Sequence, residues 1–198
     1  RPDLPYEFTV LDNDVPNAWA LPGGKISINR ALLTELDNEA ELAAVLAHEI
    51  VHAAARHGAQ TIERGMVIQG VLLGTGLATS GMEGSEAIIG AAALGGALIN
   101  QKYGREAELE ADKYGIRYMS RAGYDPQAAV TLQEKFVKLS KGKKSSWIEG
   151  LFASHPPSEE RVAANQKTAL KYPRGGYLGT SKYKQTTAIL KKTEPAYQ

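Results

Sequence analysis

The sequence predicts an α+β domain that is mainly helical and carries a small antiparallel β-sheet. Two observations indicate this class. Three short segments with strand character lie within residues 1–29, whereas the longer segments from residue 38 onward have the apolar spacing of helices. A chain of 198 residues allows one domain and leaves little room for a second. We therefore expect one domain over residues 1–170 and a basic C-terminal extension over residues 171–198.

The composition excludes several classes of function. Hydrophobic residues make up 43% and charged residues 23% of the chain, which is typical of a folded protein and rules out general disorder. Basic and acidic side chains nearly balance at a net charge of +1, so we expect no nucleic-acid partner. The chain has no cysteine, which excludes disulfides, cysteine-ligated zinc and thiol catalysis.

The predicted sheet occupies the N-terminal part. Residues 7–11 have the composition of a short strand, and a turn follows at Asn13. A second strand is expected over 17–21, where Pro22 and two glycines end it. Residues 25–29 alternate polar and apolar side chains, as a half-buried strand does. Together they predict a small antiparallel sheet.

The next element is a helix from Asn38 to about His57. Asn38 with Glu41 three residues later forms a plausible capping box, and Gly58 is the expected C-terminal stop. Residues 40–55 are apolar on nearly every face, which is typical of a helix in the core. The polar residues within this helix are therefore the ones that call for a functional explanation.

Residues 65–101 are rich in Gly and Ala and contain two apolar segments, which predict a helical hairpin. Internal packing is the expected role of this hairpin, and peripheral contact with a membrane or a partner is the alternative. The longest uncharged run, residues 66–82, is shorter than the roughly 20 apolar residues of a membrane-spanning helix. The sequence begins at Arg1 rather than Met, so we expect a preceding segment to have been removed and the remainder to be soluble.

Further helices are expected over 103–122, over 126–139 and from Ser158 onward, with a basic loop over 141–146. From Lys171 to the end the chain has six basic residues and one acidic residue. We expect a solvated tail or linker here, and attraction to an anionic surface is the alternative.

The decisive motif is His48-Glu49-Ile50-Val51-His52. Histidines at i and i+4 lie on one face of a helix, about 5–6 Å apart at Cβ, so both imidazoles can reach one metal ion. Glu49 lies about 100° around the helix from His48 and flanks this pair. A carboxylate in that position can act as general base toward a water molecule at the metal.

A catalytic zinc ion normally has three protein ligands, so one more must come from elsewhere. Metalloproteases with three histidine ligands would have Gly at 55 and His at 58, whereas this chain has Ala55 and Gly58. His57 lies about 180° from His48 on an extended helical wheel, so we expect it to face away. The three-histidine class is therefore excluded.

The third ligand is expected in the acidic segment after Arg105. On a helical wheel, Glu108 and Asp112 lie on the same face as the apolar side chains, whereas Glu106 and Glu110 lie on the polar face. Glu108 is therefore the expected third ligand. Asp112, one turn later, is placed to orient a ligating histidine. We expect the other two acids to be ordinary surface carboxylates.

Together these motifs resemble the zinc metallopeptidase family of HtpX and the CaaX-prenyl proteases, particularly its soluble bacterial cell-envelope members. The resemblance covers roughly residues 6–170. It rests on His48-Glu49-x-x-His52, Glu108-x-x-Ala111-Asp112, Ser154-His155-Pro156 and Asn17-Ala18-Trp19-Ala20-Leu21-Pro22-Gly23-Gly24. It implies a gluzincin-type zincin fold, one zinc ion held by His48, His52 and Glu108, and Glu49 as general base and acid.

The resemblance implies further roles. His155 would lie near the metal, either donating a hydrogen bond to the oxyanion or occupying the open zinc position and keeping the enzyme silent. Arg161 is expected to pair with Asp112 or Glu108. Asn17, Ala18, Trp19 and Ala20 resemble an edge strand that binds extended substrate backbone.

The implied activity is zinc-dependent endopeptidase action on unfolded or extended polypeptides in the periplasm or cell envelope of a bacterium. The alternative is a proteolytically silent, zinc-containing module that binds misfolded envelope proteins. The sequence leaves the oligomeric state open.

Overall fold

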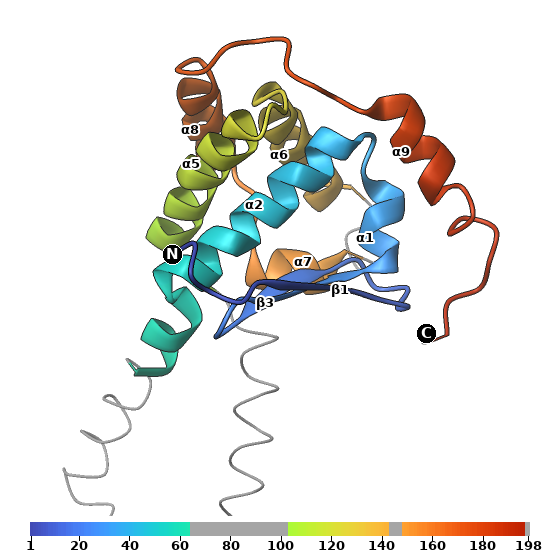
Figure 1. Ribbon diagram of the computed structural model, residues 1–198, viewed down its shortest axis with the longest axis horizontal. Helices are drawn as coiled ribbons and strands as arrows, with labels where there is room; N and C mark the ends of the chain where they lie inside the picture. Colours follow the sequence, from blue (N-terminus) through green and yellow to red (C-terminus); the bar gives the residue numbers. More distant parts are fainter. Residues whose placement is uncertain (64–102, 143–147, 197–198) are drawn as a thin grey trace, which may run out of the picture.

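The computed structural model describes residues 1–63, 103–142 and 148–196. Helices form most of this part of the chain, and a small sheet lies against one side of them (Figure 1). The predicted α+β class is therefore confirmed. The helical hairpin predicted over 65–101 lies outside the described residues, and so does most of the basic loop. The helices within the described ranges are too short or too polar to cross a bilayer.

The sheet has three strands in the order β1-β3-β2, where β1 is Glu7–Leu11, β2 is Ala18–Leu21 and β3 is Lys25–Asn29. β2 and β3 form an antiparallel hairpin, and the turn between them uses Gly23 and Gly24 at φ angles of 90° and 88°. β1 pairs with the other edge of β3 and runs parallel to it. The sheet is therefore mixed, and the expectation of a wholly antiparallel sheet is wrong. Alternating polar and apolar residues indicate a strand but not the edge to which it is added.

Helix α1 (Arg30–Glu35) follows β3 directly and leads to α2 (Glu39–Ala55), the longest helix beside the sheet. The Asn38 side chain caps α2 by accepting a hydrogen bond from the Glu41 backbone N at 2.9 Å, as the capping box predicts. The Glu41 carboxylate, however, accepts from the Asp37 backbone N at 2.8 Å rather than from Asn38. α2 ends before the predicted stop at Gly58, because Arg56 adopts the left-handed conformation with φ 60°.

The second half of the domain consists of α5 (Arg105–Arg121), α6 (Gln127–Ser140), α7 (Glu149–Ser154) and α8 (Glu159–Ala169). α5 packs along α2 (Figure 1). The two helices lie close together at Gly115, where a Cβ atom would lie 3.2 Å from the His48 backbone N. The face of α5 predicted to be apolar is buried: Glu108, Ala111, Asp112, Gly115, Ile116 and Met119.

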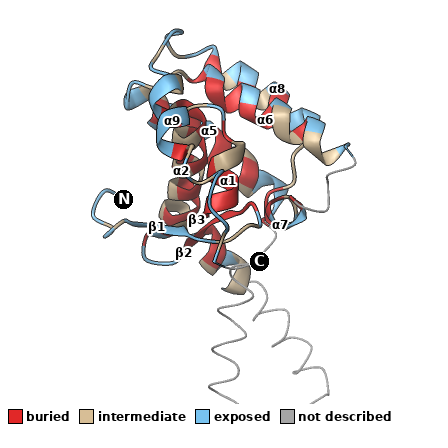
Figure 2. Cartoon of the chain, turned by 90° about the vertical axis from the view of Figure 1, so that its right-hand side faces the viewer, coloured by how far each residue is buried: buried red, intermediate tan, exposed pale blue. Residues whose placement is uncertain are grey.

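The core lies between α2, α5 and α6, with β3 and α1 closing one side (Figure 2). Its largest fully buried apolar side chains include Leu32, Ile116, Met119 and Ile148. A smaller apolar cluster, built around Ala20, Ile26 and Ala53, joins the sheet to α2. The metal-ligand motif in α2 is therefore held between two packed layers.

The C-terminal segment packs against the domain, so the expectation of a solvated tail is wrong for residues 172–196. Its helix α9 (Thr180–Thr187) places Tyr183 in the core, where the phenol donates a hydrogen bond to the Leu33 backbone O at 2.7 Å. Beyond α9, the backbone carbonyl groups of Leu190 and Thr193 accept hydrogen bonds from Arg30. The residues of this segment that reach the core, such as Tyr183, are widely spaced among polar residues. This spacing explains why composition alone indicated a tail.

Candidate metal centre

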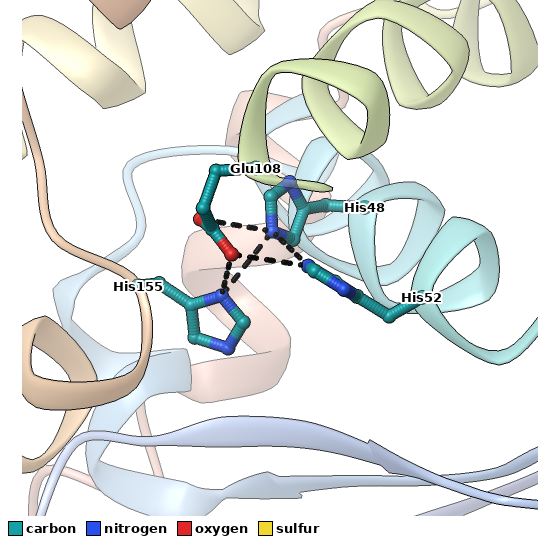
Figure 3. Close-up of side chains that lie close together, drawn as sticks. All are labelled: His48, His52, Glu108 and His155. Atoms are coloured by element: carbon teal, nitrogen blue, oxygen red, sulfur yellow. Dashed lines mark hydrogen bonds and ion pairs between the residues drawn. The ribbon is translucent and has the colours of Figure 1, made fainter. Parts of the chain in front are cut away.

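Two helices bring three potential ligands to one point. His48 and His52 project from the same face of α2, and their Nε2 atoms lie 2.9 Å apart (Figure 3). Glu108 reaches them from the first turn of α5, with Oε1 3.3 Å from His52 Nε2 and Oε2 3.6 Å from His48 Nε2. The ligand atoms of these residues and of His155 all lie within 4.8 Å of one another. The structure thus brings together the predicted ligand set.

The separations fit a divalent cation. Donors at a tetrahedral zinc ion, with bonds of roughly 2.0–2.2 Å, lie about 3.3 Å apart. The three donor pairs at 2.9, 3.3 and 3.6 Å bracket that value. Because His52 and Glu108 are only 1% and 2% exposed, a cation here would be largely shielded from water. Two imidazoles and one carboxylate form a donor set that suits zinc.

Glu49 lies beside the ligands without belonging to the group of potential ligands. It is 2% exposed, and its Oε2 has no hydrogen-bond partner among the residues that the structure describes. Its Oε1 lies 3.5 Å from His155 Nε2. A buried carboxylate oxygen without a partner is costly. This oxygen is therefore free to accept a proton from a water molecule in the site.

Asp112 and Arg161 lie on the far side of His48. Asp112 accepts a hydrogen bond from His48 Nδ1 at 2.9 Å, which leaves Nε2 directed at the other ligands. Arg161 donates from Nε and Nη2 to Asp112, each at 2.7 Å, and its Nη1 lies 2.7 Å from Glu108 Oε2. Sequence reasoning expected Arg161 to pair with Asp112 or Glu108, and it contacts both.

Nearby cationic side chains lower the pKa of both acids. Burial alone would raise the pKa of Asp112, but the Arg161 guanidinium outweighs it and lowers the pKa to about 2. Burial alone would also raise the pKa of Glu108, but His155 and His48 outweigh it and hold the pKa well below its usual value. Both carboxylates are therefore anionic at neutral pH.

His155 follows the last residue of α7 and is 7% exposed. Its Nδ1 lies 3.0 Å from Glu108 Oε1 and 3.3 Å from His48 Nε2 (Figure 3). Burial alone would lower the pKa of His155, but Glu108 and Glu49 outweigh it and raise the pKa. The structure thus places His155 among the ligand atoms themselves.

His57 is buried at 5% exposure and faces His52, so the expectation that it faces away is wrong. That expectation assumed an uninterrupted helix, whereas the left-handed Arg56 ends α2 and a helical turn resumes at residue 57 with a different orientation of the side chains. His57 in turn contacts Glu110, which sequence reasoning treated as an ordinary surface acid. Sequence reasoning also missed Tyr103, which stacks on the His52 ring at a centroid distance of 3.9 Å. For His57, the available signal in the sequence was a histidine just beyond the end of the helix that carries the motif.

The predicted substrate strand packs against the helix that carries the two histidines and supplies none of the potential ligands. β2 forms one edge of the sheet and contacts α2. Asn17, Ala18, Trp19 and Ala20 are all buried, at 9%, 0%, 8% and 5% exposure. Their side chains therefore support the strand, and any contact with an extended polypeptide would use the backbone at the free edge.

Two facing helices supply two imidazoles and a carboxylate, and beside them lies Glu49, whose Oε2 is buried without a hydrogen-bond partner in the described part of the chain. This arrangement is typical of a metallopeptidase centre. Residues 1–169 match peptidase family M48, and the chain therefore belongs to this family. This confirms the family resemblance indicated by the sequence motifs.

Similar proteins include a β-barrel assembly-enhancing protease of Escherichia coli K12, which is 35% identical over 164 residues. The matched region covers 80% of this chain and 33% of that protein. The mitochondrial metalloendopeptidase OMA1 of Schizosaccharomyces pombe is 35% identical over 161 residues, covering 81% of this chain and 45% of that protein. OMA1 of Saccharomyces cerevisiae is 32% identical over 167 residues, covering 80% and 46%. The chain thus spans a third to a half of the length of these relatives.

Proposed function

We propose that the chain is a zinc-dependent endopeptidase that hydrolyses peptide bonds in unfolded or extended polypeptides. The observation that carries the proposal is the position of Glu49, a buried carboxylate with one unpartnered oxygen, next to His48, His52 and Glu108 as ligands. A bound zinc ion would supply Lewis acidity, polarising the scissile carbonyl group and acidifying a water molecule. The relatives named as proteases support peptide bonds as the substrate.

Residues of the protein would transfer the proton and orient the ligands. Glu49 takes one proton from the attacking water, whose oxygen bonds to the carbonyl carbon, and delivers that proton to the leaving amine as the C–N bond breaks. Asp112 holds the proton of His48 on Nδ1, so the Nε2 lone pair stays directed at the centre. Arg161 keeps Asp112 ionised, and it also pairs with Glu108.

The free edge of β2 is the proposed binding site for substrate backbone. β3 occupies one edge of β2, and no strand within the described ranges pairs with the other. An extended polypeptide could add there as a further strand, with main-chain hydrogen bonds giving affinity without a strict sequence requirement. This mode suits unfolded substrates.

We place this activity in protein quality control in the periplasm or cell envelope of a bacterium. Support comes from the relatives named β-barrel assembly-enhancing protease, whereas other relatives are named as mitochondrial enzymes. The chain spans only part of the length of each relative. The proposed compartment and physiological substrate therefore refer to this domain and not to the whole relatives.

Exchange of the proposed base tests the mechanism. Glu49→Gln is expected to retain stoichiometric zinc and to lose casein cleavage by about 10²–10⁴-fold, because the amide cannot accept the proton. Zinc is measured by elemental analysis, and cleavage by release of labelled peptide. His48→Ala is the matched control and is expected to lose both zinc and activity. Wild-type rates in Glu49→Gln would refute the assignment.

His155 supports a second candidate function, a zinc-containing binding module that is proteolytically silent. Its Nδ1 lies among the ligand atoms, where it could hold the open zinc position. If His155 instead holds an active peptidase silent until it is displaced, His155→Ala is expected to raise casein cleavage, whereas loss of an oxyanion donor would lower cleavage by about 10²–10³-fold. Stoichiometric zinc without cleavage in both wild type and His155→Ala would favour the binding module.

A further inference from the structure

His57 occupies a position that an uninterrupted α2 could not provide. The left-handed backbone of Arg56 ends the helix, and helical structure resumes at residue 57, where the His57 side chain lies beside His52. The His57 ring is 5% exposed, and its centroid lies 4.9 Å from that of His52 at an angle of 75°. Tyr103 packs on the other side of this pair and stacks on His52. The His57 ring is therefore fixed in place beside a ligand.

The contacts of His57 form a chain that leads away from the centre. Its Nδ1 lies 2.9 Å from His52 Nδ1, the nitrogen on the far side of the ring from the ligand group. Its Nε2 lies 3.3 Å from Glu110 Oε2 on α5. Each nitrogen of the buried ring thus has one partner, and the partners lie on two different helices.

The direction of each hydrogen bond follows from the chemistry of imidazole. A neutral His52 that offers the lone pair of Nε2 to a metal keeps its ring proton on Nδ1, which makes Nδ1 a donor. The facing Nδ1 of His57 must then accept, so the His57 proton lies on Nε2. There it donates to the Glu110 carboxylate, an acceptor only.

We propose that His57 is the positioning residue of His52: its Nδ1 accepts from His52 Nδ1, and Glu110 holds it in the matching tautomer by accepting from its Nε2. The inference rests on the metal centre of the proposed function and adds an outer contact to it. The distance of 2.9 Å between the two Nδ1 atoms allows one N–H and one lone pair to face each other. His57 acts on the metal solely through His52.

Two variants of the 198-residue chain test the proposal. His57→Leu fills the space but cannot accept a hydrogen bond, and it is expected to weaken zinc binding by about 10–100-fold. His57→Asn restores an acceptor near the Nδ1 position and is expected to bind zinc within about threefold of wild type. Zinc dissociation constants are measured by competition with a chelator, and the unfolding midpoints of the zinc-free variants are compared in parallel. A packing role would lower both midpoints and leave the two zinc affinities alike.

The ring nitrogens can also be observed without any substitution. In the zinc-loaded wild-type chain, ¹⁵N chemical shifts of the histidine rings are expected to show a protonated Nδ1 on His52, and an unprotonated Nδ1 with a protonated Nε2 on His57. A proton on His57 Nδ1, or a His57→Leu variant that binds zinc as wild type does, would overturn the inference and leave the proposed function standing. A wild-type chain that binds no zinc would instead overturn the proposed function itself.

Discussion

The two histidines of one motif are supported in different ways. His48 donates to Asp112, a buried carboxylate that Arg161 binds through two nitrogen atoms. His52 faces a second imidazole, and the carboxylate beyond it, Glu110, is 49% exposed. One support is a buried ion pair that links α5 and α8, and the other is a chain of imidazole rings that ends near solvent. The two histidines of the motif are therefore held by different interactions. His48 contacts a charged carboxylate, whereas His52 is held by packing and hydrogen bonding.

The largest expected difference concerns stability. Arg161→Met leaves Asp112 and Glu108 buried without their cation, and we expect it to destabilise the zinc-loaded chain by about 3–5 kcal/mol. Arg105→Met breaks an exposed pair with Glu160 and is expected to cost about 1 kcal/mol or less. Urea unfolding of both variants measures the difference. Equal losses would mean that burial does not distinguish the two ion pairs.

The second largest difference is expected in zinc affinity, between variants of the residues that contact His48 and those that support His52. Asp112→Asn removes the charge behind His48, and we expect it to weaken zinc binding by about 10–100-fold. Glu110→Gln acts one residue further from the metal and near solvent, so a loss of about threefold or less is expected. Chelator competition on the two variants gives the comparison directly. If the Glu110 variant lost as much affinity as the Asp112 variant, the chain of rings would be as important as the ion pair.

The smallest effect is expected at Arg56, which supports His57 only through its backbone. Arg56→Gly removes the cost of a left-handed side-chain-bearing residue and is expected to change stability by about 1 kcal/mol or less, with zinc affinity unchanged. Arg56→Val is expected to destabilise by about 1–3 kcal/mol, because a β-branched residue is strained at φ 60°. Thermal unfolding with and without zinc measures both. A Gly variant that lost zinc would show that the Arg56 side chain itself supports the centre.

Much of the centre could be predicted from the sequence because helical periodicity fixes it. The spacing of His48 and His52 and the wheel that turns Glu108 and Asp112 inward need only 3.6 residues per turn. The three strands were found for the same reason, since their apolar period is local. Features that depend only on periodicity within one helix or strand could therefore be predicted from the sequence.

The errors arose where one residue or a distant contact decides the outcome. His57 was misplaced because a wheel cannot anticipate a left-handed Arg56. The direction of β1 depends on which edge of β3 is free, and the docking of α9 depends mainly on Tyr183 reaching the core. The short helices α1 and α7, of six residues each, have too few turns to show a period. Tertiary contacts, absent from any local pattern, determined all of these.

Gly115 has a consequence for the choice of ion. The donors come from α2 and α5, so the gap between these helices sets the ionic radius that all three donors can reach at once. A single hydrogen atom on Gly115, facing the His48 backbone, sets that gap. Any larger substituent would have to push the helices apart by a few tenths of an ångström. We therefore expect a substitution at Gly115 to change zinc affinity by moving Glu108 relative to His48 and His52, although Gly115 itself supplies no ligand.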